Sequence, residues 1–303
     1  HVYSAMPALV RYMRQVQPPI MHTGKDRVIQ AMVIANGLAG RPGALVLRMG
    51  TTLSPMLKER GPMQRTLSRL GLRWLYPKAR EVLVESEGIG RDLRSLTGLS
   101  ADRTPVVPLP VIPESLFNEA QPRPEHSWFH DDGPPIVLGV GELTKRKGFD
   151  VLLQAFARVR SQRRCRLMIV GEGQQRQALQ RQAQTLGIDG ELTMPGFRRD
   201  VYAFMAHADL LAFTSRREGS PFSLSEALAV GTPVVSTDCP SGPREILQAG
   251  RFGPLVAVDD VDGLSEAIVA TLDEPLDPAT LKEAARRFEV QHCTEGLIQH
   301  LGL

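Results

Sequence analysis

From Pro134 onward, short apolar runs alternate with amphipathic stretches, and this alternation limits the possible folds more than any other feature of the chain. Residues 136–140 have the length and composition of a buried strand, and residues 149–160 have apolar side chains at helical spacing. Strands and helices that take turns in this way are typical of βαβ units, in which helices cover a parallel sheet. We therefore expect an α/β fold.

The same alternation divides the chain into parts. The second part has further predicted strands at 166–170, 192, 210–214, 233–236 and 255–258, with helices at 174–186, 201–207 and 223–230. The first part is less regular, with predicted helices at 7–17, 27–39 and 63–76 and strands at 44–47 and 82–84. Prolines between 104 and 135 indicate a linker, because proline continues neither element well. We expect a first domain with its linker at 1–132, a second domain at 133–280, and a C-terminal helix at 281–303 that packs back toward the first domain.

Composition excludes several classes of protein. A chain of 303 residues is long enough for two domains, and it has no apolar run long enough for a membrane-spanning helix. A formal net charge of +3 does not favour a nucleic-acid-binding protein. The three cysteines are widely spaced and odd in number, which favours a cytoplasmic location. No signal peptide is recognisable, and because the chain begins with His1, we expect its natural start to lie upstream.

A glycine-rich and basic loop follows the first strand of the second part. It runs from Gly139 to Gly148 and contains Lys145, Arg146 and Lys147. Glycines at the end of a buried strand let a ligand approach the backbone, and the cations suit an anion. The loop matches neither a P-loop nor G-x-G-x-x-G, and a solvated basic loop is the alternative interpretation.

Two carboxylates flank a helix N-terminus further along. Glu218 follows a predicted strand, Glu226 lies in the first turns of the next helix, and Gly-Ser-Pro leads into that helix. Free amides at the positive end of a helix dipole can bind phosphate. Carboxylates on either side of a diphosphate could hold the sugar and ribose hydroxyls of a nucleotide sugar. Alternatively, Glu226 only favours the helix N-terminus electrostatically.

The stretch SRREGSPFSLSEALAVGTPVVSTDCPSGPREIL, residues 215–247, resembles the family-4 retaining glycosyltransferases of the GT-B fold. Their characteristic motif has two glutamates with seven residues between them, as Glu218 and Glu226 have here. The resemblance extends to VGELTKRKGFDVLLQAF, LMIVGEG, MPGFRRDVYAFMAHADLL and GPLVAVDDVDGLSEAI, and more faintly to VLRMGTTLS and VLVESEGIGRDL in the first part.

This resemblance implies two Rossmann-like domains whose parallel sheets face each other across a cleft. It also implies transfer of a hexose or N-acetylhexosamine, with retention, from a nucleoside diphosphate sugar, most often UDP-linked, to a glycan or lipid-linked glycan. Lys147 and Glu218 match the catalytic positions, where the lysine holds the diphosphate and the glutamate lies near the donor sugar. The donor-binding positions match Gly141, Arg146, Phe197, Arg198, Phe222, Ser223, Leu224 and Glu226. The family implies no cofactor and no obligate metal.

Three departures from the family pattern bear on activity. Glu142 stands where the family usually has an arginine beside the diphosphate, and Arg146 is the candidate replacement. Leu109 stands where the linker usually has an asparagine before Pro110. The first strand and glycine-rich loop of the acceptor domain are not recognisable, so we expect that domain to be incomplete. These departures keep open a non-catalytic nucleotide-sugar-binding protein, and an epimerase is a further alternative.

Three other residues or motifs suggest chemistry but have simpler interpretations. Asp260-Val261-Asp262 has the form of a metal-binding D-x-D motif, but we expect Asp262 to cap a helix. Cys239 has no recognisable base nearby and is interpreted as a buried turn residue. His22 is expected in a loop, where a structural role is the simpler interpretation.

The segment 57–80 is basic and amphipathic, with Glu59 as its single acidic residue. Such a helix can lie on an anionic membrane surface, which would suit a lipid-linked acceptor and a peripheral position at the inner membrane face. Alternatively, it is a solvated helix whose arginines cover apolar packing.

Overall fold

The computed structural model describes residues 2–58, 60–109 and 111–303, so that His1, Glu59 and Pro110 lie outside it. The chain forms two compact units, His1–Pro108 and Leu109–Leu303. Residues 109 and 111–132, which the sequence analysis groups with the first part as a linker, thus belong to the second unit.

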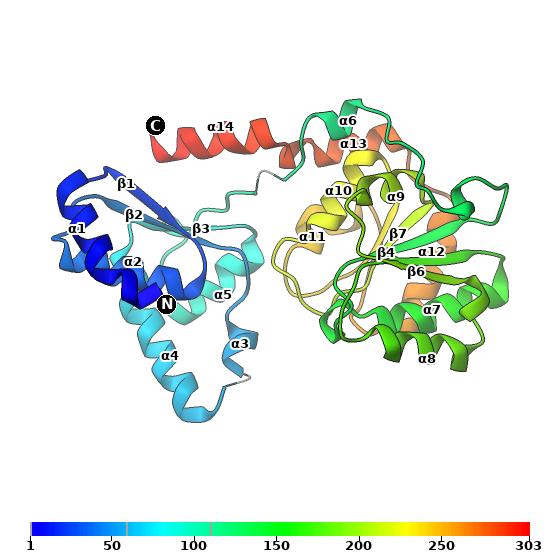
Figure 1. Cartoon of the computed structure of the whole chain (residues 1–303), viewed down its shortest axis with the longest axis horizontal. Helices are drawn as coiled ribbons and strands as arrows, with labels where there is room; N and C mark the ends of the chain where they lie inside the picture. The colour runs from blue at the N-terminus through cyan, green and yellow to red at the C-terminus, as the bar shows by residue number, and fades with distance from the viewer. Residues whose placement is uncertain (1, 59, 110) are drawn as a thin grey trace. The chain divides into compact units, whose positions relative to one another are not determined.

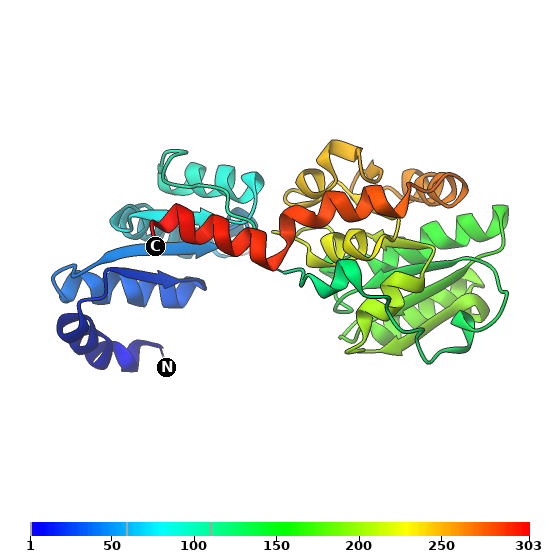
Figure 2. The same cartoon turned by 90° about the horizontal axis from the view of Figure 1, so that it is seen from above.

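The first unit contains a parallel sheet of three strands in the order β1-β2-β3. Its elements are η1 (Val2–Ala5), α1 (Met6–Val16), β1 (Ile20–Thr23), α2 (Asp26–Leu38), β2 (Ala44–Met49), α3 (Ser54–Lys58), α4 (Pro62–Leu75), η2 (Tyr76–Lys78), β3 (Glu81–Val84) and α5 (Glu87–Thr97). Helices α1 and α2 lie on one side of these strands and α5 on the other (Figure 2). Ile29, Leu47 and Tyr76 are fully buried in its core. His22 lies in strand β1, so its expected place in a loop was wrong.

The second unit contains a parallel sheet of six strands in the order β6-β5-β4-β7-β8-β9. The strands are β4 (Ile136–Val140), β5 (Arg166–Val170), β6 (Leu192–Gly196), β7 (Leu210–Phe213), β8 (Val234–Thr237) and β9 (Leu255–Val256). The helices are α6 (Ser115–Asn118), η3 (Ser127–Phe129), η4 (Lys145–Lys147), α7 (Phe149–Gln162), α8 (Arg176–Leu186), η5 (Asp189–Glu191), α9 (Val201–His207), α10 (Phe222–Val230), α11 (Pro243–Ile246), η6 (Gln248–Gly250), α12 (Val261–Asp273), α13 (Pro278–Ala285), η7 (Arg286–Phe288) and α14 (Val290–Leu301).

Each face of this sheet carries its own apolar core. Successive strand residues point to opposite faces. In β4, Val137 therefore packs with Leu152 and Phe156 of α7, whereas Leu138 packs with residues of α9 and α10 such as Phe204 and Leu224. Figure 1 shows α7 and α8 on one side of the sheet and α9 and α10 on the other.

The strand order reverses between β4 and β7. From β4 the chain adds β5 and β6 on one side, and it then returns to add β7, β8 and β9 on the other. In open parallel sheets, the loops that follow the two strands at such a reversal diverge and leave a crevice that commonly binds ligands. The loops after β4 and β7 carry Lys147 and Glu218 respectively.

Candidate functional site at the carboxyl end of the second sheet

The loop after β4 is shaped by glycines where other side chains would not fit. Gly141 has a φ of +152°, and a Cβ placed on it would lie 3.1 Å from Cε of Lys147. The lysine side chain therefore crosses directly over Gly141. Gly141 thus makes room for the lysine, and its expected part in donor binding stays a prediction.

The same loop is fastened to the end of β7. Gly148 has a φ of +68°, and a Cβ there would lie only 2.0 Å from the carbonyl oxygen of Thr214. The Thr214 hydroxyl donates to the Lys147 carbonyl at 2.9 Å, and the Arg216 amide donates to the Arg146 carbonyl at 2.8 Å. These contacts fix the basic loop beside the loop that carries Glu218.

Arg216 adds a second tie between these loops. Its guanidinium donates to both carboxylate oxygens of Asp150 at 2.9 and 2.7 Å, to Asp259 at 2.7 Å and to the Lys145 carbonyl at 2.5 Å. Bidentate pairs of this kind hold geometry better than single hydrogen bonds. Sequence reasoning missed Arg216, because its partners are far apart in the chain.

Arg146, Lys147 and Glu218 meet at the strand reversal. Oε1 of Glu218 lies 2.5 Å from Nη1 of Arg146 and 2.8 Å from Nζ of Lys147, and it accepts a hydrogen bond from the Ser215 hydroxyl at 2.9 Å. The side chains of Glu218 and Lys147 are 12% and 14% exposed, so this pair is largely shielded from water, whereas Arg146, the third member of this ion cluster, is 37% exposed. Two cations on one carboxylate oxygen can pair with an anion that displaces the glutamate.

Helix α10 begins four residues after Glu218. Its N-cap is Pro221, which supplies no side-chain hydrogen bond to the first turn. The Leu224 amide donates to the Pro221 carbonyl at 3.2 Å, so one of the three residues predicted to bind the donor through this segment already has a partner for its amide. Phe222 is 40% exposed and Ser223 is half-buried.

Glu226 lies one turn further along α10 and contacts Tyr202 of α9. The Tyr202 hydroxyl donates to Oε1 of Glu226 at 3.2 Å. Burial raises the pKa of Glu226, although the hydrogen bond from Tyr202 acts in the opposite direction. Burial and the nearby carboxylate raise the pKa of Tyr202 to about 12. Sequence reasoning named Glu226 but not the tyrosine that holds it.

Phe197 and Arg198 follow the edge strand β6. Phe197 is 72% exposed. Arg198 donates to both carboxylate oxygens of Asp200 at 2.9 and 2.8 Å, and its guanidinium lies 5.3 Å from the ring centroid of Phe204. Since β6 is separated from β4 by β5, these residues stand apart from the ion cluster along the same edge of the sheet.

Asp260, Asp262 and Cys239 lie in structural positions of the second unit. The N-cap of α12 is Asp260, which accepts from the Gly263 amide at 2.9 Å, so the expectation that Asp262 is the cap was wrong. Asp262 instead pairs with Arg158. Cys239 is buried as expected, and burial raises the pKa of its thiol to about 12. Within the described residues, no group of three or more His, Cys, Asp or Glu side chains could hold a metal ion.

The first unit has charged residues at the carboxyl ends of its own strands. Arg48 of β2 pairs with Glu85, just after β3, at 3.4 Å, and their side chains are 12% and 9% exposed. A Cβ on Gly50 would lie 2.6 Å from the Glu85 carboxylate, so this glycine leaves space for that side chain. Burial raises the pKa of Glu85, and burial followed by the Arg48 charge lowers the pKa of His22. The faint motifs VLRMGTTLS and VLVESEGIGRDL could have indicated this pair.

Glu142 is exposed, in the loop that also carries Lys147. Arg146, the candidate replacement for the family's arginine, contacts Glu218 as described above. The loop thus keeps two cations at the strand reversal although the usual arginine position holds a carboxylate.

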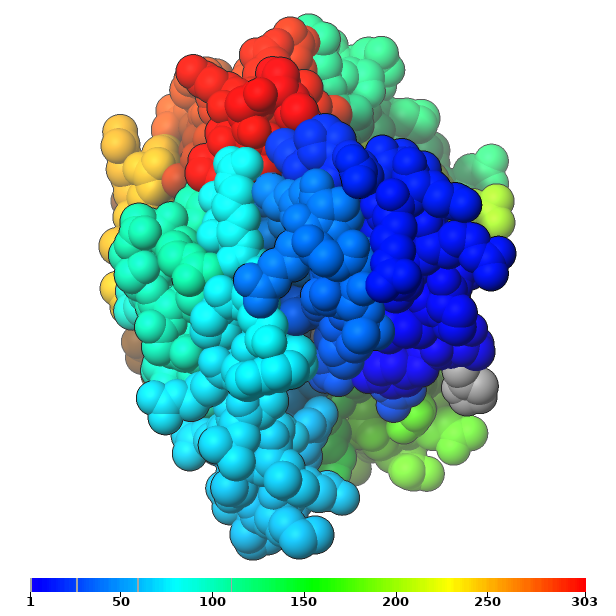
Figure 3. Space-filling model, turned by 90° about the vertical axis from the view of Figure 1, so that its left-hand side faces the viewer, coloured from blue at the N-terminus to red at the C-terminus, as the bar shows by residue number. Residues whose placement is uncertain are grey.

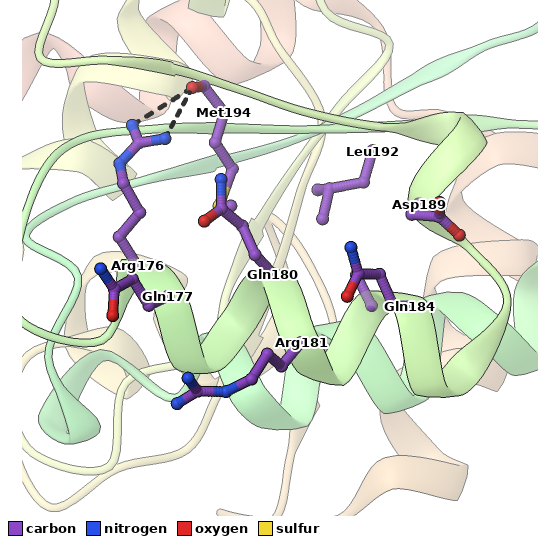
Figure 4. A pocket seen from close by; sticks show the side chains of 9 residues that line it. Arg176, Gln177, Gln180, Arg181, Gln184, Asp189, Leu192 and Met194 are labelled. Atoms are coloured by element: carbon purple, nitrogen blue, oxygen red, sulfur yellow. Dashed lines mark hydrogen bonds between the residues drawn. The ribbon is translucent and has the colours of Figure 1, made fainter.

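A separate hollow of about 530 Å³ lies between α8 and β6 (Figure 4). Arg176 at one end of it donates to the Met194 carbonyl at 3.1 and 3.2 Å, and glutamine side chains of α8 line its length. None of the predicted site residues lines this hollow, and we assign it no role. No helix in the described part of the chain combines the length and the apolar character needed to cross a membrane.

Comparison with solved structures identifies the fold. The structure matches the crystal structure of Anabaena Alr3699/HepE in complex with UDP with a TM-score of 0.83 at 21% identity, over 99% of this chain and 82% of that one. It matches the apo form of the lipopolysaccharide outer core galactosyltransferase WaaB with a TM-score of 0.77 at 20% identity, over 98% of this chain and 78% of that one. The fold is that of the GT-B glycosyltransferases, with two Rossmann-like units.

Sequence comparison identifies relatives that are longer than this chain. An N-acetylgalactosamine-N,N'-diacetylbacillosaminyl-diphospho-undecaprenol 4-alpha-N-acetylgalactosaminyltransferase of Campylobacter jejuni is 29% identical over 235 residues, which are 78% of this chain and 62% of that protein. The lipopolysaccharide 1,6-galactosyltransferase of Salmonella typhimurium is 30% identical over 197 residues, which are 62% of this chain and 52% of that protein. The chain thus spans less than two thirds of the length of these relatives.

The family model described as "Glycosyl transferases group 1" matches residues 122–288, which contain the ion cluster, Tyr202 and helix α10. This match covers more than half of the chain and most of the second unit. The chain therefore belongs to the group 1 glycosyl transferases.

Proposed function

We propose that the chain transfers a hexose or N-acetylhexosamine from a UDP-linked donor to a hydroxyl of a glycan or lipid-linked glycan, with retention of anomeric configuration. The observation that carries the proposal is the meeting of Arg146, Lys147 and Glu218 at the strand reversal. Solved neighbours of the same fold contain UDP and UDP-glucose, which supports a uridine donor. The Campylobacter jejuni relative is named for an undecaprenol-linked acceptor, which supports a lipid-linked glycan.

In this proposal the donor diphosphate takes the place of the Glu218 carboxylate beside the two cations. Lys147 and Arg146 neutralise the diphosphate, and the released Glu218 orients hydroxyls of the donor sugar. Glu226 accepts from the ribose hydroxyls, held by Tyr202, and Phe197 and Arg198 border the base. Segment 222–224 meets the phosphate or the sugar, with the positive end of α10 adding to the field.

The reaction step is a displacement on one face of the sugar. The bond between the anomeric carbon and the β-phosphate oxygen breaks, and the bond to the acceptor oxygen forms on the same side. The acceptor proton passes to the departing phosphate oxygen. Fixed cations beside the leaving group stabilise the charge that develops there. Because Lys147 and Arg146 supply that charge, we propose that no metal and no cofactor is required, so that activity persists in EDTA.

The enzyme would act at the cytoplasmic face of the inner membrane, where a lipid-linked acceptor is confined.

A non-catalytic nucleotide-sugar-binding protein is the second candidate, and the observation that favours it is the carboxylate of Glu142 in the loop that carries Lys147. Such a protein would bind UDP-sugars without consuming them.

The test is turnover of UDP-glucose, UDP-galactose and their N-acetylated forms with glycan acceptors, followed by UDP release and by NMR of the anomeric configuration. We expect one donor to react with retention. Glu218→Gln should lower kcat by at least about a hundredfold, in the range seen when a single transition-state contact is lost. The matched control Glu172→Gln changes a carboxylate that is 53% exposed and should keep full activity. Donor binding without turnover would favour the second candidate, and donor isomerisation without acceptor would indicate an epimerase.

A further inference from the structure

Helix α4 of the first unit exposes a continuous apolar stripe. Met63, Leu67, Leu70 and Trp74 are 75%, 61%, 59% and 63% exposed. Their spacings of four, three and four residues place them along one face of the helix. Figure 3 shows residues of this region, in sky blue, protruding at the lower end of the visible face. Single exposed apolar residues are normal on a protein surface, but a contiguous patch of large ones is typical of an interaction site.

The stripe is separate from the face that packs α4 into the unit. Leu72 is buried in the core of the first unit, and Leu75 is packed against that core. Arg69 and Arg73 are exposed, and the four side chains of the stripe stay more than half exposed beside them. The alternative interpretation, in which arginines cover the apolar packing, therefore explains neither the exposed apolar stripe nor the exposed arginines.

The segment that contains the stripe carries charge of one sign. Residues 60–80 contain six lysines and arginines and no aspartate or glutamate. Arg69 and Arg73 form an exposed row beside the apolar stripe, and Nζ of Lys78 lies 3.4 Å from the ring centroid of Trp74. Tryptophan with a neighbouring cation is typical of side chains that lie at the headgroup level of a bilayer.

We infer that α4 is the surface by which this chain lies on an anionic phospholipid bilayer, with Met63, Leu67, Leu70 and Trp74 inserted and Arg69, Arg73 and Lys78 at the headgroups. Apolar area and basic charge on one helix both increase the affinity for such a surface. A second copy of the chain fits less well, because pairing two α4 helices would bring like-charged arginine rows together. The inference rests on the membrane location in the proposed function and names the surface that provides it, and it does not depend on the donor site.

The test is flotation of the whole chain with vesicles of phosphatidylcholine alone or mixed with phosphatidylglycerol, without nucleotide. We expect flotation only with the phosphatidylglycerol vesicles and its loss at high salt, since exposed charges are screened. The variant Leu67→Ser/Leu70→Ser/Trp74→Ser should bind at least about tenfold more weakly, as should Arg69→Glu/Arg73→Glu. All five positions are exposed, so circular dichroism and the Tm should stay unchanged.

The matched control is Tyr12→Ser/Val16→Ser, which removes two apolar side chains of α1 that are each 54% exposed. It should float like the parent chain. No flotation with phosphatidylglycerol vesicles, or equal loss in the control and the α4 variants, would overturn the inference. So would a dimer in analytical ultracentrifugation that the α4 variants dissociate, because the stripe would then be a contact between copies.

Discussion

Replacing Gly148 by alanine tests whether the close approach between the basic loop and β7 holds the site together. Gly148 has a φ of +68°, and its Cβ would meet the backbone oxygen of Thr214 at 2.0 Å. Gly187, at the end of α8, has a φ of +67° and nothing within 4 Å of its Cβ position. The two positions share the same backbone conformation and differ in the space around them.

The expected free energies differ accordingly. An alanine in the left-handed region costs roughly 1–2 kcal/mol at either site. At Gly148 the obstacle is a backbone carbonyl, which cannot rotate away as a flexible side chain can, so overpacking adds about 1–3 kcal/mol. We therefore expect Gly148→Ala to lower the free energy of unfolding of the second unit by about 2–5 kcal/mol, against roughly 1–2 kcal/mol for Gly187→Ala.

Urea unfolding followed by the fluorescence of Trp128 measures this difference, because Trp128 packs against the core of the second unit. A Trp74→Phe background removes the only other tryptophan. UDP affinity should fall at least about tenfold in Gly148→Ala, equivalent to 1.4 kcal/mol, because the displaced loop carries Lys147. It should be unchanged in Gly187→Ala. Equal destabilisation by the two variants would refute the close approach between Gly148 and the Thr214 carbonyl.

Three further predictions concern single side chains of the second unit. Burial raises the pKa of Glu226, so the folded state loses stability as the pH rises from the ordinary carboxyl pKa through the raised one. In urea titrations, the stability of Glu226→Gln relative to the parent chain should therefore increase from acidic to neutral pH, and a decrease would contradict the burial argument. Asp260→Ala should lower the free energy of unfolding by about 1 kcal/mol, because it removes the cap of α12. Asp262→Ala should leave kcat and the Tm nearly unchanged. A metal-dependent loss of activity in Asp262→Ala would instead support the D-x-D interpretation. Arg216→Lys keeps the charge but loses the bidentate contact with Asp150, so calorimetry should show weaker UDP binding. The control Arg176→Lys should bind UDP as the parent chain does.

Most of the second unit could be predicted from its sequence, because each buried strand and amphipathic helix carries its own periodicity. Helix α10 was expected at 223–230 and spans Phe222–Val230. Strand β1 was not predicted, since its four residues include His22 and follow two prolines, and neither length nor pattern marks them as a strand. The C-terminal helix was expected as one element over 281–303, but α13 ends at Ala285 and α14 begins at Val290.

The site could be predicted only in part. Family resemblance named Lys147, Glu218 and Glu226, and the structure brings the first two into contact. The contact of Arg146 with the Glu218 carboxylate depends on β4 and β7 being neighbours in the sheet. The order of the strands in a sheet cannot be read from the local sequence. Tyr202 was missed for the same reason, since it reaches Glu226 from a different helix. The structure does not test the roles of Phe197, Arg198 and segment 222–224 in donor binding, which stay predictions.

The measurement that tests the central claim most directly is a calorimetric titration of the chain and its Lys147→Ala variant with UDP, GDP and ADP, with Lys145→Ala as the matched control. Lys145 is an exposed neighbour in the same loop, whereas Lys147 contacts Glu218. If the carboxyl end of the second sheet holds the donor diphosphate, UDP binds selectively, Lys147→Ala weakens it by at least about tenfold, and Lys145→Ala leaves it almost unchanged. If UDP binds neither the chain nor its control, or binds Lys147→Ala as tightly as the parent, the donor site is not where Arg146, Lys147 and Glu218 meet.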